Sequence, residues 1–401
     1  MKILVLNLYY PPDTSATAKI AAAFLEPLAA KHEVTLICGR PSYDPTEKRP
    51  WRLWQSERLR GITVIRVGST DYPRTQMPRR VLNYLTYVAL SIPRALFVRS
   101  DLILAMTDPP FEGIVGGFVA MLKLQPFVYN IRDLYPDMAL GGSIVEPGPL
   151  ARIWEVFHRW ALRRATRIIV LGEDMRARII SKGVPSERVA IVRDGVELAP
   201  TSSSAPERDA EVIRTIRSDY RFVLLHAGNL GFYGAWETLL AAARELAEDG
   251  VSLVFIGDGA LRPRLEAAAA NSPNVRFLPF FPADKLASVL AAADAHVVTV
   301  KRGLEGVVVP SKLYGILAAG RPIVAVAPGE TDAASLAARD GFGVSADPDN
   351  PAELVAIVRT LLGDPARLAA MGSAARVAAA RYARPKETLK FMQILEDANQ
   401  P

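Results

Sequence analysis

Residues 200–208 read Pro-Thr-Ser-Ser-Ser-Ala-Pro-Glu-Arg, and this stretch divides the chain into two similar halves. Proline together with small hydroxyl residues is typical of turns and linkers. Short apolar runs alternate with alanine- and leucine-rich helical segments before this stretch, and the same alternation begins again after it. Apolar runs that alternate with helices are typical of parallel, doubly wound sheets. The sequence therefore predicts an α/β protein with two Rossmann-like halves, joined near residues 195–220.

The expected strands are short and apolar, and the segments between them have helical spacing. The first half offers strands at Ile3–Asn7, Val34–Cys38, Thr63–Val67, Leu102–Met106, Phe127–Ile131, Ile168–Leu171 and Val189–Val192. The second half offers Phe222–His226, Leu253–Ile256, Val275–Leu278, Ala295–Val300 and Ile323–Val326. The last segment, Arg384–Asn399, has helical composition. Its periodicity leaves open whether it covers the second half or crosses back to the first.

The composition narrows the class of protein. The 401 residues are 50% hydrophobic and 22% charged, which fits two folded domains and excludes general disorder. The net charge of +6 suits phosphates, nucleotides or an acidic membrane surface. The basic residues are scattered, without the long tract typical of nucleic-acid binding, so we expect no nucleic-acid partner. The start of the chain reads as a buried strand rather than a signal peptide.

No metal or cofactor is expected. The single cysteine, Cys38, cannot form a disulfide within the chain and makes a thiolate metal site implausible. It also fits a reducing, cytoplasmic compartment. The four histidines lack metal-ligand spacing. Asp347-Pro348-Asp349 matches an Asp-x-Asp pattern, but we interpret it as a turn because it lies in a proline-containing loop.

The loop after the first strand contains Thr14, Ser15 and Thr17, just before an expected helix. Ligands of parallel sheets bind at the carboxyl ends of strands, where small residues let backbone amides approach a phosphate or a sugar. The same residues equally fit an ordinary strand-to-helix turn with Ser/Thr capping. Sequence alone leaves these two interpretations open.

A charged pair, Arg132-Asp133, directly follows the expected strand Phe127–Ile131. Asp133 could act on an acceptor hydroxyl or bind sugar hydroxyls. It could instead cap a helix or form an ion pair. Its place at the ligand end of a strand favours a functional role.

Two motifs in the second half favour a diphosphate site. Gly228 and Asn229 follow a strand, where glycine allows close backbone approach to a diphosphate. Pro310-Ser311 opens a helix with Lys312 in its first turn, where a lysine is unfavourable unless an anion compensates it. This mismatch favours a phosphate ligand over a solvated lysine. Gly257-Asp258-Gly259 is a weaker signal of the same kind.

Several motifs, in order and at plausible spacing over nearly the whole chain, resemble those of family 4 glycosyltransferases. They lie at residues 170–197, 227–231, 255–259, 310–313 and 318–322. The segment Arg132–Pro136 looks like the Asp-Leu-Trp-Pro element of a subgroup that acts on lipid-linked sugars in surface polysaccharide assembly. The resemblance implies the GT-B fold, in which two Rossmann-like domains face a cleft. It implies an acceptor domain at residues 1–198, with a return helix at 384–401, and a donor domain at 220–383.

The resemblance also implies the residues of the site. Lys312 and Asp133 would be the catalytic residues, and Arg132, Asp133 and Tyr135 would lie on the acceptor side. The nucleotide sugar would be bound by Thr14, Ser15, Thr17, Gly228, Asn229, Gly257, Asp258, Phe281, Glu305, Pro310, Ser311 and Lys312.

The sequence departs from the family pattern at several positions. Many members carry two glutamates eight positions apart, where this chain has Val307 and Gly315, and Glu305 is close but out of register. The loop at residues 231–234 lacks the Arg and Lys that many members direct at the diphosphate. Arg132 stands where a histidine is often found.

The implied reaction is a retaining, metal-independent transfer from a nucleotide sugar, with UDP-sugars favoured, to a glycan or polyprenyl-diphosphate-linked acceptor. Lys312 would stabilise the departing diphosphate, which could itself take the acceptor proton. The pathway implied is bacterial polysaccharide or lipopolysaccharide biosynthesis. The missing glutamates suggest a rival, a non-catalytic nucleotide-sugar-binding subunit, and an epimerase on the same fold is another. An NAD-dependent oxidoreductase is disfavoured because no Gly-x-Gly-x-x-Gly follows the first strand.

Residues 79–99 are apolar and aromatic between flanking arginines. Such a segment could lie in a bilayer surface with its arginines at anionic head groups, or it could be a core helix. The family resemblance favours peripheral contact with the inner face of the cell membrane.

Overall fold

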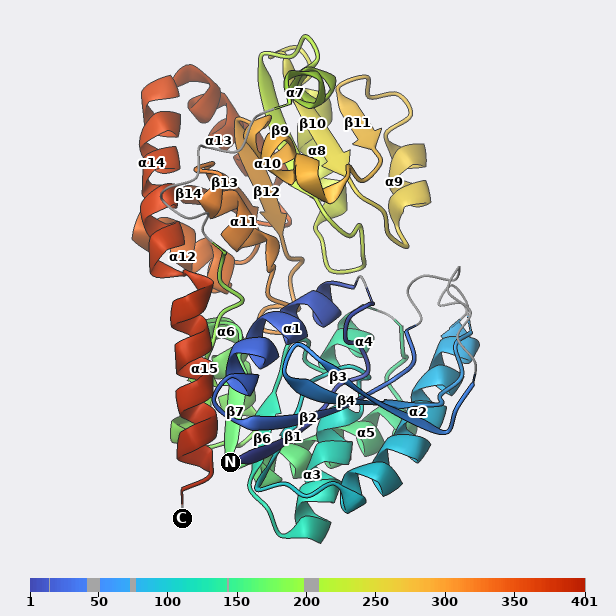
Figure 1. Ribbon diagram of the computed structural model, residues 1–401. Helices are drawn as coiled ribbons and strands as arrows, with labels where there is room; N and C mark the ends of the chain where they lie inside the picture. The colour runs from blue at the N-terminus through green and yellow to red at the C-terminus, as the bar shows by residue number, and fades with distance from the viewer. Residues whose placement is uncertain (14, 42–50, 73–76, 143, 198–208, 401) are drawn as a thin grey trace.

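The structure, a computed structural model, describes residues 1–13, 15–41, 51–72, 77–142, 144–197 and 209–400. It consists of two α/β lobes, the first lower and the second upper in Figure 1. The predicted linker at residues 200–208 lies outside the described residues, as do Thr14 and Pro401.

The first domain contains, among the described residues, an eight-stranded sheet in the order β3-β4-β2-β1-β5-β6-β7-β8. All neighbouring strands are parallel except β3 and β4, which form an antiparallel hairpin. The chain reverses direction of winding between β1 and β5, which makes this the switch point of the sheet. The strands are β1 (Lys2–Leu6), β2 (Glu33–Cys38), β3 (Trp54–Leu59), β4 (Ile62–Val67), β5 (Leu102–Ala105), β6 (Phe127–Asn130), β7 (Arg167–Val170) and β8 (Val189–Ile191).

The second domain contains, in the part of the chain described, a six-stranded parallel sheet in the order β11-β10-β9-β12-β13-β14. This order places the switch point between β9 and β12, as in a doubly wound nucleotide-binding sheet. The predicted fold class, two Rossmann-like doubly wound domains, is confirmed. The strands are β9 (Phe222–Ala227), β10 (Val251–Ile256), β11 (Val275–Leu278), β12 (Ala295–Thr299), β13 (Ile323–Val326) and β14 (Gly343–Ala346).

Helices cover both faces of the first sheet. Alternate residues of β1 point to opposite faces, so that Leu4 and Leu6 enter one core and Ile3 and Val5 enter another. No described helix is long and apolar enough to cross a membrane. The helices are α1 (Ala16–Ala29), α2 (Met77–Phe97), α3 (Glu112–Lys123), α4 (Asp137–Gly141), α5 (Pro149–Arg164) and α6 (Glu173–Ser181).

The helices of the second domain pack in the same way on its sheet. The first of them, α7, lies within residues 195–220, where the sequence predicted the connection between the two halves. Its Val212 and Ile216 are buried in a core of the second domain. These helices are α7 (Ala210–Arg217), α8 (Trp236–Glu245), α9 (Arg262–Ala268), α10 (Leu286–Ala291), α11 (Lys312–Ala318), α12 (Asp332–Asp340), α13 (Pro351–Gly363) and α14 (Pro365–Arg381).

The last helix, α15 (Arg384–Ala398), leaves the second domain and lies against the first (Figure 1). Its Phe391 is buried against Phe24 of α1, with ring centroids 5.2 Å apart. Farther along, His32 Nε2 lies 3.0 Å from Glu396 Oε1. The chain therefore crosses between the domains twice, and α15 ties the second domain to α1.

We expect Phe391→Ala to lower the free energy of unfolding by about 3–5 kcal/mol, because it leaves a cavity in the core beneath α15. Leu389 is on the same helix with 60% of its surface exposed, so Leu389→Ala should change the value by less than about 0.5 kcal/mol. Urea unfolding of both variants checks this. Equal stability of the two would contradict the packing of α15 on α1.

Candidate active site

The two domains meet where β6 and β12 end. The segment after β12 reaches the first domain, where Val308 forms an antiparallel bridge with Asp133. The amide of Leu134 donates to the carbonyl of Val307 at 3.0 Å, and the Val307 side chain is fully buried in the core of the first domain. This contact brings the loop that precedes α11 to the loop that carries Asp133.

Two aspartates, the partly buried Asp174 and the buried Asp332, hold the same contact by capping each other's helices. Asp174 on α6 accepts a hydrogen bond at 3.0 Å from the amide of Asp332, the first residue of α12. Asp332 in turn accepts from the amide of Glu173 at 3.0 Å and pairs with Arg193 at 2.7 Å. Each carboxylate satisfies amides at the start of the opposite helix, which fixes the approach of the domains.

Lys312 lies at the carboxyl end of β9, beside the switch point of the second sheet. Its Nζ is 3.0 Å from Nε2 and 3.4 Å from Nδ1 of His226, the fully buried histidine of β9. Burial, and then the charge of Lys312, lower the pKa of His226 well below its ordinary value, so the ring is neutral. Burial lowers the pKa of Lys312 to about 7. Among the described residues no carboxylate pairs with this lysine, so its positive charge is available to bind an anionic ligand.

Two glycines keep side chains away from the ammonium group. Gly228 has φ +144°, and a Cβ there would lie 3.2 Å from Lys312 Nζ. Gly257 has φ +142°, and a Cβ there would lie 2.1 Å from the carbonyl oxygen of Gly228. Both backbone conformations disfavour other residues. The result is bare backbone beside a cation, which suits close approach of a phosphate group.

Neighbouring loops complete this end of the second domain. Leu230 donates from its amide to the carbonyl of Asp258 at 2.8 Å, which ties the loop of Gly228 and Asn229 to that of Gly257. The side chains of Asn229 and Asp258 are exposed. The guanidinium of Arg262 donates to the carbonyl of Gly257 at 2.5 Å. Sequence analysis did not single out Arg262, and its position in α9 gives no motif.

Phe280 and Phe281 border the same loops. Phe280 is exposed, and its ring lies 3.2 Å from where a Cβ of Gly257 would be. Phe281 is partly buried against the second core. Two aromatic rings therefore lie at the edge of the glycine-lined surface, and one of them, Phe281, belongs to the residues that the family resemblance assigns to the nucleotide sugar.

The first domain presents Asp133 to this site, and two residues that sequence analysis missed lie near it, Asp108 of the first domain and Tyr233 of the second. Burial, and then the charge of Asp108 after β5, raise the pKa of Asp133 to about 7, against an opposing effect of Arg132. Burial raises the pKa of Tyr233 in the second domain, and the nearby charge of Asp133 raises it further. The hydroxyl of Tyr233 donates to the carbonyl of Asn229. Asp108 lies at the switch point of the first sheet, which is the signal that could have identified it.

Several predicted residues have structural partners. Ser15 is the N-cap of α1 and accepts from the amide of Ala18 at 3.1 Å, as in the capping interpretation. Thr17 lies in the first turn of the same helix. Arg132 pairs with Asp194. Tyr135 stacks on Trp154, with centroids 5.8 Å apart.

The segment before α11 contains the remaining predicted residues. The carboxylate of Glu305 accepts from the amide of Gly303 at 2.8 Å, and its carbonyl accepts from Arg178 at 3.0 Å. Pro310 is partly buried, and Ser311 is the exposed N-cap residue of α11, although its side chain makes no capping bond. Thr14 lies outside the described residues.

The two departures from the glutamate pattern have different environments. Val307 is fully buried and contributes to the contact between the domains. A Cβ at Gly315 would only touch the Leu290 side chain, at 3.7 Å. Apolar packing therefore replaces a carboxylate at the first position, whereas the second position has room for a side chain.

The described residues contain no group of three or more His, Cys, Asp or Glu side chains that could hold a metal ion. Both aspartates of the Asp-x-Asp sequence, Asp347 and Asp349, pair with Arg302 at 2.7 Å. The interpretation of this segment as a turn agrees with that pairing.

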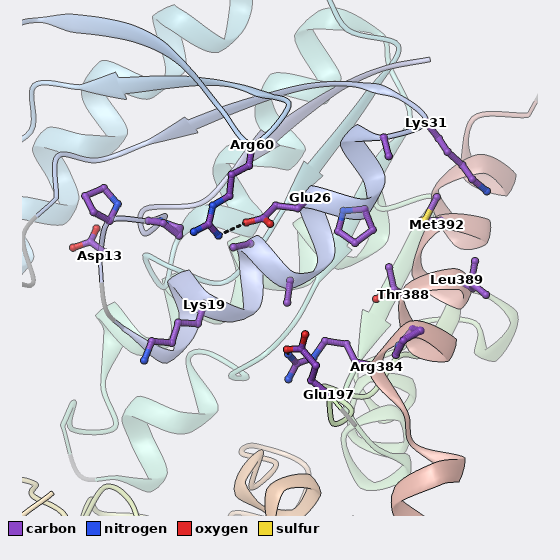
Figure 2. Close-up of a pocket in the computed structure, with 17 residues that line it drawn as sticks. Asp13, Lys19, Glu26, Lys31, Arg60, Glu197, Arg384, Thr388, Leu389 and Met392 are labelled. Carbon is purple, nitrogen blue, oxygen red and sulfur yellow. Dashed lines mark hydrogen bonds and ion pairs between the residues drawn. The ribbon is translucent and has the colours of Figure 1, made fainter. Parts of the chain in front are cut away.

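A wide hollow of about 1140 Å³ lies between α1 and α15 (Figure 2). Arg60 pairs with Glu26 at 2.7 Å on its α1 side, and Arg384 lies 3.6 Å from Glu197 near the crossover. Its lining contains neither Lys312 nor Asp133. The hollow is therefore separate from the candidate site.

Comparison with known proteins agrees with this arrangement. Residues 16–195 match the glycosyl transferase 4-like domain, and residues 221–364 match glycosyl transferases group 1. The chain is 27% identical over 376 residues to the putative colanic acid biosynthesis glycosyl transferase WcaI of Escherichia coli, covering 90% of this chain and 92% of that protein.

Solved structures share the fold. Anabaena Alr3699/HepE in complex with UDP matches with a TM-score of 0.70 at 18% identity, over 99% of this chain and 100% of that one. WaaG, a glycosyltransferase involved in lipopolysaccharide biosynthesis, matches with a TM-score of 0.64 at 18% identity, over 98% and 99%. The two domain matches together span most of the sequence, and the chain belongs to the family 4 glycosyltransferases, with the GT-B fold.

Proposed function

We propose that this enzyme is a retaining transferase that moves a sugar from a UDP-sugar to a glycan or lipid-linked acceptor in polysaccharide biosynthesis. The observation that carries the proposal is the position of Lys312. Its ammonium group is held by a neutral histidine beside the bare backbone of Gly228, without a carboxylate partner among the described residues. A diphosphate is an anion of the size and charge that such a position accommodates.

The names of related proteins support the donor and the pathway. HepE has been solved with UDP and with UDP-glucose, and WcaI and WaaG are named for colanic acid and lipopolysaccharide biosynthesis. We assign the donor to the second domain, against Gly228, Asn229, Gly257, Asp258 and Phe281. The acceptor then lies on the first domain, at Asp133.

The proposed mechanism follows from the charges in the site. As the bond from the sugar to the diphosphate breaks, the departing oxygens gain negative charge, which Lys312 stabilises without a metal ion. The acceptor hydroxyl attacks from the same face, and its proton passes to the departing phosphate. Asp133, on the opposite side of the site, accepts a hydrogen bond from that hydroxyl and orients it. Closure of the domains excludes water and so limits donor hydrolysis.

We also propose that the enzyme acts as a peripheral protein at the cytoplasmic face of the membrane, through α2. Leu82 and Leu85 are exposed on this helix, whereas Tyr84 and Tyr87 are buried in the core of the first domain. One face of the helix therefore agrees with the core interpretation of residues 79–99, and the opposite face is available for the proposed membrane contact. The exposed face supports membrane contact.

Replacing Lys312 with alanine should lower kcat roughly 100- to 1000-fold, because the developing charge on the diphosphate loses its cation. Lys31→Ala, at an exposed lysine in the turn after α1, is the matched control and should keep wild-type turnover. The measurement is UDP release from the best UDP-sugar, with bacterial membrane lipid extract as the acceptor source. Wild-type turnover in Lys312→Ala would remove this residue from the mechanism.

The dependence of kcat/KM on pH should be a narrow bell centred near pH 7. Below about pH 7 Asp133 becomes protonated and no longer accepts the acceptor hydrogen bond. Above about pH 7 Lys312 of the free enzyme loses its proton and no longer attracts the diphosphate. Asp133→Asn should therefore flatten the acid limb and leave the alkaline limb in place. An acid limb that persists in this variant would assign it to another group.

A further inference from the structure

A groove with a purely apolar lining runs over the outer side of α2, α3 and α5. Its volume is about 650 Å³, and all of its lining residues are aliphatic or aromatic. The lining includes Phe111, Phe118, Ile153, Trp154, Phe157 and Trp160. Apart from the indole N–H groups of Trp154 and Trp160, these side chains carry no hydrogen-bonding group that could orient a sugar or a nucleotide, and such a surface suits a hydrocarbon.

The sequence of α5 produces this groove because the helix has two apolar faces. Ala151, Ala161 and Leu162 are buried on the side that packs on the first domain. Leu150, Ile153, Trp154 and Phe157 recur at helical spacing on another side, where they line the groove. Ile153 and Phe157 are each 53% exposed. A second apolar stripe on a helix predicts a second apolar partner.

The groove borders the loops of the candidate acceptor side through one side chain that lines it, Trp154. Trp154 lines the groove and stacks on Tyr135, two residues after Asp133, at 5.8 Å between centroids. Trp154 also contacts Phe111, three residues after Asp108, at 5.0 Å. One indole ring therefore joins the groove to both loops that carry the acidic residues of the first domain.

A cation lies near the end of the groove where Tyr135 is located. Arg80 is close enough to Tyr135 for an electrostatic interaction between the two side chains. Its guanidinium also donates a hydrogen bond to the hydroxyl of Tyr84. No carboxylate pairs with Arg80 within the part of the chain that the structure describes. Val88, which lines the groove, is two turns farther along α2, roughly 12 Å from Arg80. An apolar groove that ends near an arginine without a carboxylate partner among the described residues fits an amphiphile with an anionic head.

We propose that this groove binds the hydrocarbon chain of a lipid acceptor, whose phosphate lies at Arg80 and whose sugar reaches Asp133. This proposal rests on the proposed function and identifies the acceptor as an amphiphilic lipid phosphate. Trp154 lines the groove and packs on the loop that carries Asp133. This contact favours a bound chain over a general bilayer contact, because a surface that only lies on a bilayer need not be next to the acceptor residues. The nearby arginine favours a lipid phosphate over an apolar face of another protein.

The test uses the full-length protein with hexyl, octyl and decyl phosphate below their micelle concentrations. Binding is followed by the fluorescence of Trp154 and Trp160, with Trp154→Phe and Trp160→Phe to identify the reporting ring. Each added methylene should tighten binding roughly fourfold. Arg80→Gln should weaken binding of decyl phosphate and leave binding of decanol unchanged.

The matched variants are Phe157→Glu and Leu122→Glu, which place the same charge at residues of similar exposure, 53% and 52%. Only Phe157 lines the groove. Phe157→Glu should therefore abolish chain-length dependence, whereas Leu122→Glu should bind decyl phosphate as the wild type does. Circular dichroism of both variants checks that they fold.

Three outcomes would overturn the proposal. The first is no binding of decyl phosphate by a folded wild-type protein that binds vesicles of phosphatidylglycerol, which would indicate a bilayer face. The second is equal loss of decyl phosphate binding in both glutamate variants. The third is self-association that Phe157→Glu abolishes, which would indicate a second copy of the chain. UDP-glucose binding is measured on the same samples, so a failure of the proposed function at the donor site is distinguishable from a failure of the groove.

Discussion

The contact between the loop after β6 and the segment before α11 is the constraint on which the rest of the site depends. The bridge between Asp133 and Val308, with the mutual capping by Asp174 and Asp332, fixes two domains that are otherwise joined by crossing segments. Buried polar groups that satisfy each other specify one arrangement, because any other arrangement leaves them unpaired. That arrangement places the proposed acceptor residue and the proposed phosphate-binding lysine in one site.

The departures from the family pattern are consistent with this contact. A glutamate at position 307 would put a carboxylate where Val307 is fully buried between the domains, at a large desolvation cost. The Glu305 carboxylate, two positions earlier in the chain, accepts a hydrogen bond from the amide of Gly303. The positive charge that we propose for binding the diphosphate is that of Lys312, whose ammonium group is oriented by His226. A neutral histidine orients the ammonium without neutralising it, which a carboxylate in the same place would do.

The sequence predicted the two doubly wound sheets because their strands are continuous apolar runs. It missed β3 and β14, which lack a continuous apolar run and lie at the edges of their sheets, where little burial is required. It also predicted Lys312 at the start of a helix and Gly228 after a strand, because both predictions depend only on neighbouring residues in the sequence. His226 and Tyr233 acquire their significance only through Lys312 and Asp133, which are far away in the sequence and which periodicity cannot identify. Periodicity alone also leaves open which domain α15 covers, because amphipathic spacing does not identify the partner surface, and only the family resemblance implied the first domain.

The most direct test of the central claim is thermal unfolding with UDP, UDP-glucose, GDP, dTDP and NAD. A ligand at a hundred times its dissociation constant adds roughly 2.7 kcal/mol to the free energy of unfolding. The account predicts that UDP and UDP-glucose raise the melting temperature of the wild type and that Lys312→Ala loses this response, while NAD has no effect. Stabilisation by NAD, or by no nucleotide in a folded sample, would contradict the claim that this site binds a UDP-sugar through Lys312.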